Sequence, residues 1–413
     1  MPTSADNDNP TDNPASPYSG PMSGVRVLDL GVWVAGPFAA TLLADFGAEV
    51  IKIERPGLGD PMRYRGTMES AAAHWCMDGR NKKSMTLDLS TERGQDILAQ
   101  LIGHADVLID NHRPGMLDAW GFTEARIRSL NPGLIVSTVS GFGQNGPYAH
   151  RLAFDRIAAA MGGLLYLNGE ADRPPVRTGV IISDYVTALF NAIGILMALY
   201  HRDAKGGGGE RMDVAMYECI FRILENTLGA YDKMGIHRQR MGNITPGFYP
   251  DDMFETLDGK WVVLSAVSDQ QFAALCGVIG RAELAHDPAL ATLNDRGRQV
   301  ERLQSVIGAW VRATPSREVV AQLEAARVPC ALVMGIDDIV DDPHYRARNA
   351  IIEVEDPQYG TLKHPAVTPR LSYNPGAVHR GAPTLGADTD AILRDILALS
   401  ETDIAELHRQ QIV

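Results

Sequence analysis

A glycine-rich segment, GFGQNG at residues 141–146, is the first group of residues whose types and spacing could do chemistry. It has the G-x-G-x-x-G spacing of loops that bind a dinucleotide pyrophosphate, and it follows the apolar run LIVSTVS. In such loops the backbone N–H groups at the start of a helix face the phosphates. The segment therefore raises the question whether the chain is a nicotinamide or flavin enzyme.

The residues around the glycines argue against a dinucleotide site. Pro147 follows the third glycine directly, and no helical period of apolar residues begins before Ala153. The acidic residue that should bind the ribose would be Glu170 or Asp172, but a further predicted helix lies in between. The first βα turn, GVWVAGP, has too few glycines for the fingerprint. We expect the loop to line a ligand cleft, because glycine lets backbone N–H groups approach a ligand closely.

Other catalytic patterns are missing from the sequence. The DFG at residues 45–47 has no HRD upstream, so it has no kinase context. The 11 histidines form no HExxH, and there is neither a G-x-S-x-G elbow nor a Walker A loop. The four cysteines are scattered without a CxxC pair, which favours a reducing compartment. We expect no metal site and no disulfide framework.

The bulk properties limit the class of protein. A chain of 413 residues is long enough for two domains, and a net charge of −13 argues against a nucleic-acid surface. The longest apolar run, residues 185–200, is short for a bilayer and contains Asn191, so it predicts a buried helix. Residues 1–21 are rich in Asn, Asp, Pro and Ser and predict a disordered tail without a secretion signal. We expect a cytoplasmic protein with no membrane and no nucleic-acid partner.

The first half of the chain alternates between strand and helix patterns. Strands are predicted at VRVLDL, EVIKIERP, MTLDLS, DVLIDN and GLIVSTVS, with amphipathic helices between most of them. Alternation over more than 100 residues predicts a parallel, doubly wound, Rossmann-like α/β domain.

The second half has a different pattern. The segment MDVAMYECIFRILENTLGAYDKMG predicts one extended helix, and FETLDGKWVVLSA predicts a hairpin around its Asp-Gly turn. We expect a large domain over residues 22–224, a small α+β domain over 225–325 and a return to the large domain over 326–413.

Seven segments together resemble class III CoA-transferases of the formyl-CoA and carnitine CoA-transferase type. The resemblance covers most of the chain from Val25 onward. Its segments are VRVLDLGVWVAGP, GAEVIKIERPGLGDPMR, RNKKSMTLDL, ADVLIDNHRPGMLDAWGF, NPGLIVSTVSGFGQNGPY, DRIAAAMGGLLYLNGEADRPPVRTG and DPHYRAR. The resemblance implies an interlocked homodimer with a Rossmann-like, CoA-binding large domain (residues 22–224) and a small α+β domain. It also implies CoA thioesters and small carboxylic acids as substrates, with no metal, no nicotinamide and no permanently bound cofactor.

The family's nucleophile is an aspartate that lies after a Gly-Gly pair and before a proline-containing turn. Residues 162–163 and 174–175 are such landmarks, and they place the nucleophile at Asp172, with Glu170 as the fallback. An aspartate that attacks a thioester gives a mixed anhydride and CoA thiolate, which then forms an aspartyl-CoA thioester. The oxyanions formed on the way need backbone N–H donors, for which Gly141 and Gly143 are candidates.

The resemblance also implies a set of CoA-binding residues. They are Val34, Ala35, Arg55, Leu87, Leu89 (within the segment Leu87 to Ser90), Asn111, His112, Arg113 and Ser140. Arg55 suits adenine or phosphate because a guanidinium stacks and forms paired hydrogen bonds. Lys82 and Lys83 could reach phosphates, although lysines in a loop are more often solvated. One arginine common in the family is Ala119 here, so phosphate binding falls to Arg113 or His112.

The main alternative within the same fold is a 2-methylacyl-CoA racemase, which moves an α-proton with a His and an Asp. The racemase histidine falls at Phe154, which cannot carry a proton, and the racemase aspartate falls at Asp184. We expect Asp184 to cap the helix that begins at Tyr185. A nicotinamide dehydrogenase and a non-catalytic CoA-binding protein are the alternatives from other classes.

The sequence leaves the acids themselves open. Acyl specificity is expected in the segment GNITPGFYPDD and in the small domain. Arg173, Arg177 and Arg240 are candidates to bind a dicarboxylate. Candidate pairs include a succinate-type donor with a hydroxy- or methyl-dicarboxylate, a carnitine-like acid, or formate and oxalate.

Overall fold

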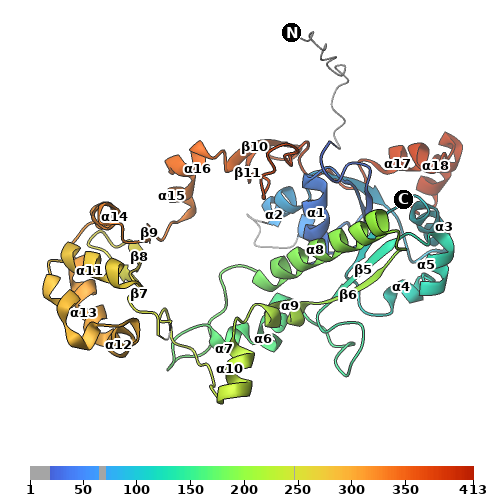
Figure 1. The fold of residues 1–413 in the computed structure, drawn as a ribbon. Coiled ribbons are helices and arrows are strands. Elements are labelled where there is room, and N and C mark those ends of the chain that lie inside the picture. The colour runs from blue at the N-terminus through green and yellow to red at the C-terminus, as the bar shows by residue number, and fades with distance from the viewer. Residues whose placement is uncertain (1–18, 65–70, 246) are drawn as a thin grey trace, which may run out of the picture. The chain divides into compact units, whose positions relative to one another are not determined.

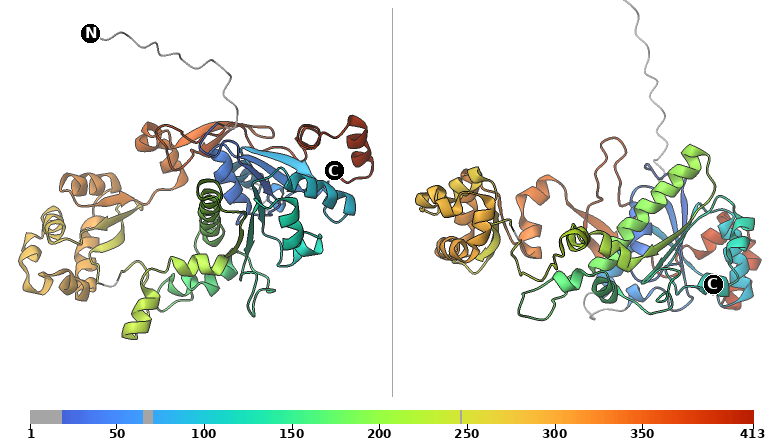
Figure 2. Two further views of the ribbon diagram at one scale, coloured as in Figure 1. Left: turned by 45° about the vertical axis from the view of Figure 1, so that its right-hand side comes forward. Right: turned by 60° about the horizontal axis from the view of Figure 1, so that its bottom comes forward.

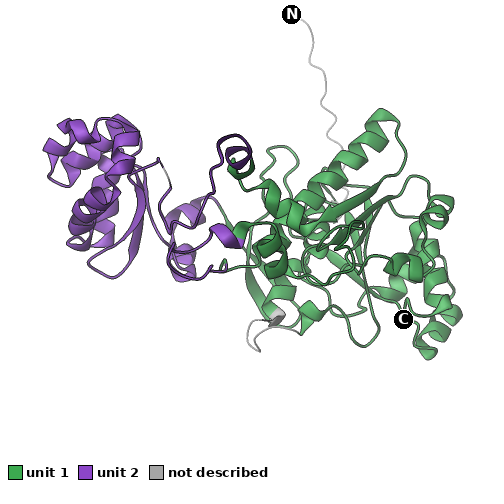
Figure 3. Cartoon of the chain, turned by 90° about the horizontal axis from the view of Figure 1, so that it is seen from below, with its two compact units in different colours: residues 1–164, 178–228, 349–413 green, residues 165–177, 229–348 purple. Residues whose placement is uncertain are grey.

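The computed structural model describes residues 19–64, 71–245 and 247–413, so most of the expected tail at 1–21 lies outside the described residues. The chain divides into two compact units (Figure 3). Unit 1 contains residues up to 164, 178–228 and 349–413, and unit 2 contains 165–177 and 229–348. The domain limits expected from the sequence, 225–325 for the small domain, differ from these unit limits and stay a prediction.

Unit 1 is built around a parallel sheet of six strands in the order β3-β2-β1-β4-β5-β6 (Figure 1). This is the strand order of doubly wound dinucleotide-binding folds, and the expected parallel α/β architecture is confirmed. The strands are β1 (Arg26–Asp29), β2 (Glu49–Glu54), β3 (Lys82–Thr86), β4 (Val107–Asp110), β5 (Ile135–Ser140) and β6 (Arg211–Ala215).

Helices cover both faces of this sheet (Figures 1 and 2). Helices α1 (Pro37–Asp45) and α8 (Ile182–Lys205) pack on one face, where small alanine side chains allow a close approach. On the other face pack α3 (Glu92–Ile102), α5 (Glu124–Leu130), α17 (Thr389–Asp395) and α18 (Glu401–Arg409).

The prediction of one long helix that begins at residue 212 is wrong. Residues 211–215 form strand β6, because RMDVA alternates between exposed and more buried side chains and pairs with β5. Two short helices follow, α9 (Met216–Arg222) and α10 (Thr227–Met234). The alternating pattern of residues 211–215 therefore determines a strand, although the residues that follow have a helical pattern.

Helix α8 is only partly buried, which corrects the expectation of a buried helix at 185–200. Leu189, Ile193, Leu196, Met197 and Tyr200 are exposed along one side. By length and composition α8 could cross a membrane, with a mean hydropathy of 1.6 in its most apolar window, of which 39% is buried. Core helices of soluble proteins pass the same test, so this is weak support for a membrane span.

Unit 2 has a small antiparallel sheet in the order β7-β8-β9. The hairpin expected around the Asp-Gly turn is confirmed as β7 (Asp251–Glu255) paired with β8 (Trp261–Ser265), and β9 (Cys330–Leu332) joins β8. Its helices are α11 (Asp269–Val278), α12 (Leu293–Arg298), α13 (Val300–Arg312), α14 (Ser316–Ala325), α15 (Ile336–Asp341) and α16 (Pro343–Ala347), with 3-10 turns at Ala282–His286 and Pro288–Leu290.

The remaining elements are short. A hairpin of β10 (Ile351–Asp356) and β11 (Gly360–Pro365) lies in the C-terminal segment of unit 1. The short helices are a 3-10 turn at Pro61–Arg63, α2 (Ala71–Asp78), α4 (Met116–Ala119), α6 (Asp155–Met161) and α7 (Leu164–Leu167).

Candidate active site

Two cavities lie at the edge of the parallel sheet where its strands end. The first has a volume of about 370 Å³ and the second about 400 Å³, and Val32 lines both. Ligands of open α/β sheets bind in the crevice beyond the carboxyl ends of the strands. Both cavities belong to unit 1 and together contain most of the residues that the sequence assigned to CoA.

The first cavity brings together Arg55, Leu87, Leu89 and His112 from the ends of β2, β3 and β4. The Arg55 side chain is exposed and forms no hydrogen bond or ion pair with the described residues. Its guanidinium is therefore available to a phosphate or an adenine.

Buried ion pairs fix the loop below Arg55. Lys52 Nζ lies 3.1 Å from Asp60 Oδ2, and Arg63 Nη2 lies 2.7 Å from Glu54 Oε2. Both side chains of the first pair are almost fully buried, so each charge depends on the other. The network holds the 55–63 loop in place as one wall of the cavity.

His112 is fixed at the other wall. Its Nδ1 atom lies 2.6 Å from Asp110 Oδ1, and its ring stands edge-on to Trp120 with centroids 5.0 Å apart. Lys82 does not reach the cavity, because its fully buried Nζ donates to Asp29 Oδ2 at 2.9 Å. The expectation of a solvated Lys82 is thus wrong.

The second cavity contains Val34, Ala35, Asn111, Ser140 and Gly141. The Asn111 side chain accepts from Val32 N and donates to Val32 O, both at 2.7 Å, so it holds the first βα turn. The Ser140 Oγ atom is buried and has no hydrogen-bond partner in the described part of the chain. Buried hydroxyls are usually bonded, so this atom is a candidate for contact with a ligand.

Two carboxylates also line the second cavity, Asp155 and Asp184. Asp155 Oδ1 accepts the Ser183 N–H at 2.7 Å, so Asp155 is bonded to the first turn of α8. The expected cap by Asp184 is wrong, because α8 begins at Ile182 and Asp184 lies inside its first turn. Asp184 accepts no hydrogen bond from the described residues, and burial, with the nearby Asp155 charge, raises its pKa to about 7.

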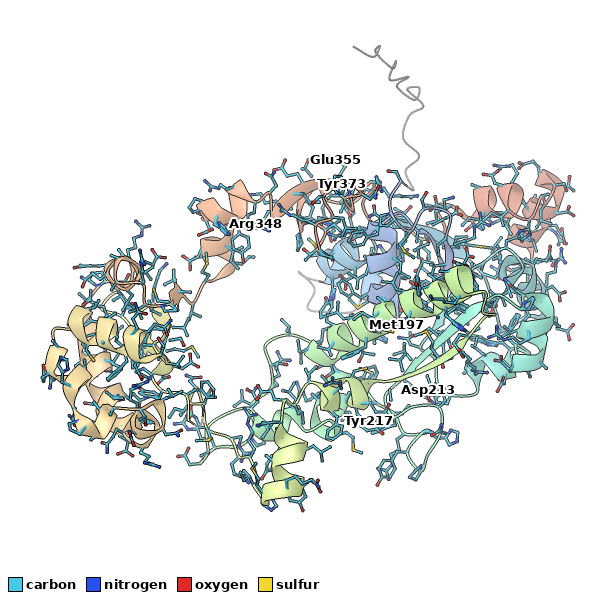
Figure 4. All side chains as sticks on the ribbon, viewed as in Figure 1. Met197, Asp213, Tyr217, Arg348, Glu355 and Tyr373 are labelled. Carbon is cyan, nitrogen blue, oxygen red and sulfur yellow. The ribbon has the colours of Figure 1, made fainter. Side chains whose placement is uncertain are left out.

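The 141–146 loop is a series of bends, and the next helix, α6, begins only at Asp155. A Cβ on Gly141 would lie 2.1 Å from that of Ala153, so close packing requires glycine there. Gly143 has φ +86° and lies in a third depression with Asp213 and Tyr217, both labelled in Figure 4. The structure therefore places Gly141 at the second cavity and Gly143 elsewhere.

Arg113 also lies apart from both cavities, in a small depression that includes Met116 and Asp118. Phe154 lines the second cavity, and its ring stands edge-on to Trp33 with centroids 6.3 Å apart. The position that a racemase would give to histidine is thus an apolar wall.

Asp172 lies in unit 2, on an exposed turn. The turn is held within unit 2, where Gly242 N donates to Gly169 O at 2.9 Å. Arg240 Nη1 donates to Tyr166 O at 2.9 Å, so this arginine supports the 165–177 segment. Arg173 and Arg177 are exposed.

From the sequence, Asp184 received a capping role or that of a racemase aspartate, and His74 was not singled out. Both line the second cavity, and no short motif surrounds either residue. The sequence does show an acidic residue, Asp184, at the start of an otherwise apolar helix. A helix cap accounts for such a residue as well as a role in catalysis does. No cluster of three metal-ligating side chains occurs within residues 19–64, 71–245 and 247–413.

Comparisons with known proteins agree with this geometry. Residues 22–389 match the signature of CoA-transferase family III. A succinyl-CoA–D-citramalate CoA-transferase from Chloroflexus aurantiacus is 41% identical over 95% of this chain and 98% of the relative. The alpha subunit of a succinyl-CoA–L-malate CoA-transferase from Chloroflexus aurantiacus is 38% identical over 95% of this chain and 92% of the relative.

A solved structure has the same fold. The crystal structure of a CAIB/BAIF family protein from Brucella suis matches with a TM-score of 0.82 and 31% identity, over 92% of this chain and 100% of that chain. The signature, the relatives and the shared fold together show that the chain belongs to CoA-transferase family III and that the protein is a CoA-transferase.

Proposed function

We propose that the protein transfers CoA from succinyl-CoA to a small dicarboxylic acid, and that the Asp184 carboxylate carries the CoA between the two acids. The observation that carries this proposal is an unbonded carboxylate in the cavity that also contains Ser140, Gly141 and the first βα turn. The sequence landmarks favour Asp172 instead, so the experiment below is designed to separate the two.

The environment of Asp184 suits a nucleophile. Hydration stabilises a carboxylate in water and makes it a weak nucleophile, whereas burial removes part of that hydration. The raised pKa of Asp184 has this cause. Asp172 is exposed, so its carboxylate stays hydrated unless a ligand covers it.

The reaction consists of four balanced steps. The Asp184 carboxylate attacks the thioester carbonyl, and CoA leaves as the thiolate, which gives a mixed anhydride. The thiolate attacks the aspartyl carbonyl and releases succinate, which leaves CoA on the aspartate as a thioester. The carboxylate of the second acid attacks this thioester and again expels the thiolate. The thiolate then attacks the new acyl group and restores Asp184.

Each attack forms an oxyanion that needs hydrogen-bond donors. The Gly141 backbone and the Ser140 hydroxyl both lie at the second cavity and are proposed as donors. Removal of one such donor typically costs about 10²–10³ in rate. Gly143, which lies in the third depression, is not part of this proposal.

The relatives support the substrate class. Two of them are named as succinyl-CoA transferases that act on citramalate and malate, which are both small hydroxy-dicarboxylates. We extend that class to this chain, with the acyl group in the second cavity and the CoA nucleotide at Arg55 in the first cavity.

We also propose a cytoplasmic homodimer. The exposed apolar side chains of α8 support a partner surface, and the free cysteines support a reducing compartment. Light scattering on the purified protein measures the subunit number directly.

An exchange screen followed by peptide mapping tests the proposal. Purified protein receives succinyl-CoA and a panel of carboxylic acids, and mass spectrometry identifies each new CoA thioester. Protein incubated with succinyl-CoA alone is then treated with hydroxylamine, which converts an aspartyl thioester into a hydroxamate. Trypsin cleaves after Arg177, so Asp172 and Asp184 fall on different peptides.

We expect transfer to a dicarboxylic acid and a hydroxamate on the peptide that begins at Thr178. A hydroxamate on the preceding peptide would support Asp172. Loss of α-deuterium from a 2-methylacyl-CoA without any transfer would support the racemase alternative.

A further inference from the structure

We propose that His74 binds the distal carboxylate of the dicarboxylic acyl group in the second cavity, and so selects succinyl-type thioesters over monocarboxylic ones. The inference rests on the proposed function, and it adds the residue that recognises the substrate. Nothing in the sequence or in the names of the relatives assigns a role to this histidine.

The chemistry of the cavity lining singles out His74. The lining contains two aspartates, several apolar side chains and uncharged polar groups, and His74 is its one residue that can carry a positive charge. An acyl group with a free carboxylate that enters an apolar cavity needs a donor or a cation, because an unpaired buried charge is costly. His74 is therefore the natural partner for that carboxylate.

The neighbours of His74 fix one side of its ring. Nε2 lies 3.0 Å from the Tyr185 hydroxyl oxygen and 3.2 Å from Asp78 Oδ2. The Tyr185 hydroxyl donates in turn to Asp78 Oδ2 at 3.2 Å. In the described part of the chain Nδ1 has no hydrogen-bond partner, so this nitrogen remains for a ligand.

The arrangement suits a carboxylate ligand. With Nε2 next to Tyr185 and Asp78, the ring can donate an N–H from Nδ1 to a substrate carboxylate. The ring is held by α2 through Asp78 and by α8 through Tyr185, which keeps it in one orientation. Held in this way, Nδ1 provides a defined point of recognition.

The position of His74 relative to Asp184 is consistent with recognition of the distal carboxylate. Asp184 precedes Tyr185 in α8 and lines the same cavity, and the electrostatic effect of His74 lowers the pKa that burial raises. The reacting carboxyl group and the recognised one lie at opposite ends of a short acyl chain. A cavity with Asp184 and His74 in its wall can thus bind both ends of a dicarboxylic acyl group.

Binding of two unreactive CoA thioethers tests this inference without turnover. S-(3-carboxypropyl)-CoA has the chain length of succinyl-CoA, and S-butyl-CoA has a methyl group in place of its carboxylate. Titration calorimetry gives the ratio of their dissociation constants. A hydrogen bond to a charged group contributes roughly 1.5–3 kcal/mol, so we expect wild type to prefer the carboxylate about 10–100-fold.

Variants show which residues cause the preference for the carboxylate-bearing thioether. His74→Leu should reduce the ratio to about 1–3, and Asp78→Asn should reduce it partly, because the ring loses its orienting partner. The control His104→Gln replaces an exposed histidine of unit 1 and should keep the full ratio. The affinity for free CoA and the melting temperature show whether each variant is folded.

A His74→Leu protein that keeps the wild-type ratio would overturn the inference. A wild type without the preference, or one that binds neither thioether, would also overturn it. Failure of the proposed function is a separate result, because it is seen as absence of CoA transfer in the exchange screen, whatever the ratio.

Discussion

The two cavities at the edge of the sheet differ in how their polar groups are satisfied. Around the first cavity the buried charges are paired, with Lys52 against Asp60 and Arg63 against Glu54. In the second cavity the Asp184 carboxylate and the Ser140 hydroxyl have no partner among the described residues. The buried charges beside the first cavity are therefore in ion pairs without a ligand, although Asp60 Oδ2 accepts no hydrogen bond from the described residues. The Asp184 carboxylate, by contrast, is in no ion pair within the described part of the chain.

The difference in how the polar groups are bonded suggests a different role for each cavity. A network of ion pairs fixes the shape of the first cavity, and the exposed Arg55 side chain remains available to the ligand. Unsatisfied groups with perturbed acidity are typical of the place where chemistry occurs. The comparison therefore supports the proposal that the first cavity positions CoA and that acyl transfer takes place in the second.

Replacement of each candidate nucleophile, Asp184 and Asp172, should give the largest difference in kcat. Asp184→Asn removes the attacking carboxylate and should lower kcat for CoA transfer by about 10⁴-fold or more. Asp172→Asn changes an exposed carboxylate and should keep kcat within about threefold. Initial rates of succinyl-CoA consumption with a dicarboxylic acceptor measure both variants.

The two variants are matched, because each exchanges one carboxylate for an amide of the same shape. Binding of free CoA shows whether the site is intact in each. The reverse result, with Asp172→Asn inactive and Asp184→Asn active, would transfer the chemistry to the exposed turn and break the comparison.

Loss of a buried charge should show how much the ion-pair network beside the first cavity stabilises the fold. Lys52→Met leaves Asp60 without its buried cation, whereas Asp29 keeps Lys82, and the loss should cost about 3–5 kcal/mol of unfolding free energy. Lys260→Met breaks a more exposed pair with Asp338 and should cost less than about 1 kcal/mol. Urea unfolding followed by circular dichroism gives both values, and a loss below about 1 kcal/mol for Lys52→Met would show that the network does not stabilise the fold.

The pH dependence of transfer tests the acidity of the second cavity. The pKa of Asp184 is raised to about 7, so its nucleophilic form predominates only above that pH. The rate should therefore rise about tenfold per pH unit below pH 7 and level off above it. An exposed nucleophile with an ordinary carboxyl pKa would instead give a rate that is flat from about pH 5 to 8.

Sequence patterns predicted the parallel sheet and the hairpin, and most of the expected CoA-binding residues lie at the two cavities, because these features depend on local periodicity and strand ends. Arg55, Leu87 and His112 each follow a strand, and the ends of parallel strands gather at one edge. The acidity of Asp184 could not be predicted in this way. It depends on burial and on Asp155, which lies 29 positions earlier in the chain and meets Asp184 only through packing.

The smallest effect is expected at Ser140. Its Oγ is buried without a partner, so Ser140→Ala should keep or raise the stability of the free protein, by up to about 1 kcal/mol. Thr138→Val is the control on the same strand, because Thr138 Oγ1 donates to Met212 O at 2.8 Å, and it should lose about 1 kcal/mol. The rate of CoA transfer should change in the opposite way to the stability. It should fall about 3–10-fold for Ser140→Ala and change little for Thr138→Val. If both variants lose the same stability and keep full activity, the Ser140 hydroxyl is satisfied in the free protein, and the contrast between the two cavities then rests on Asp184 alone.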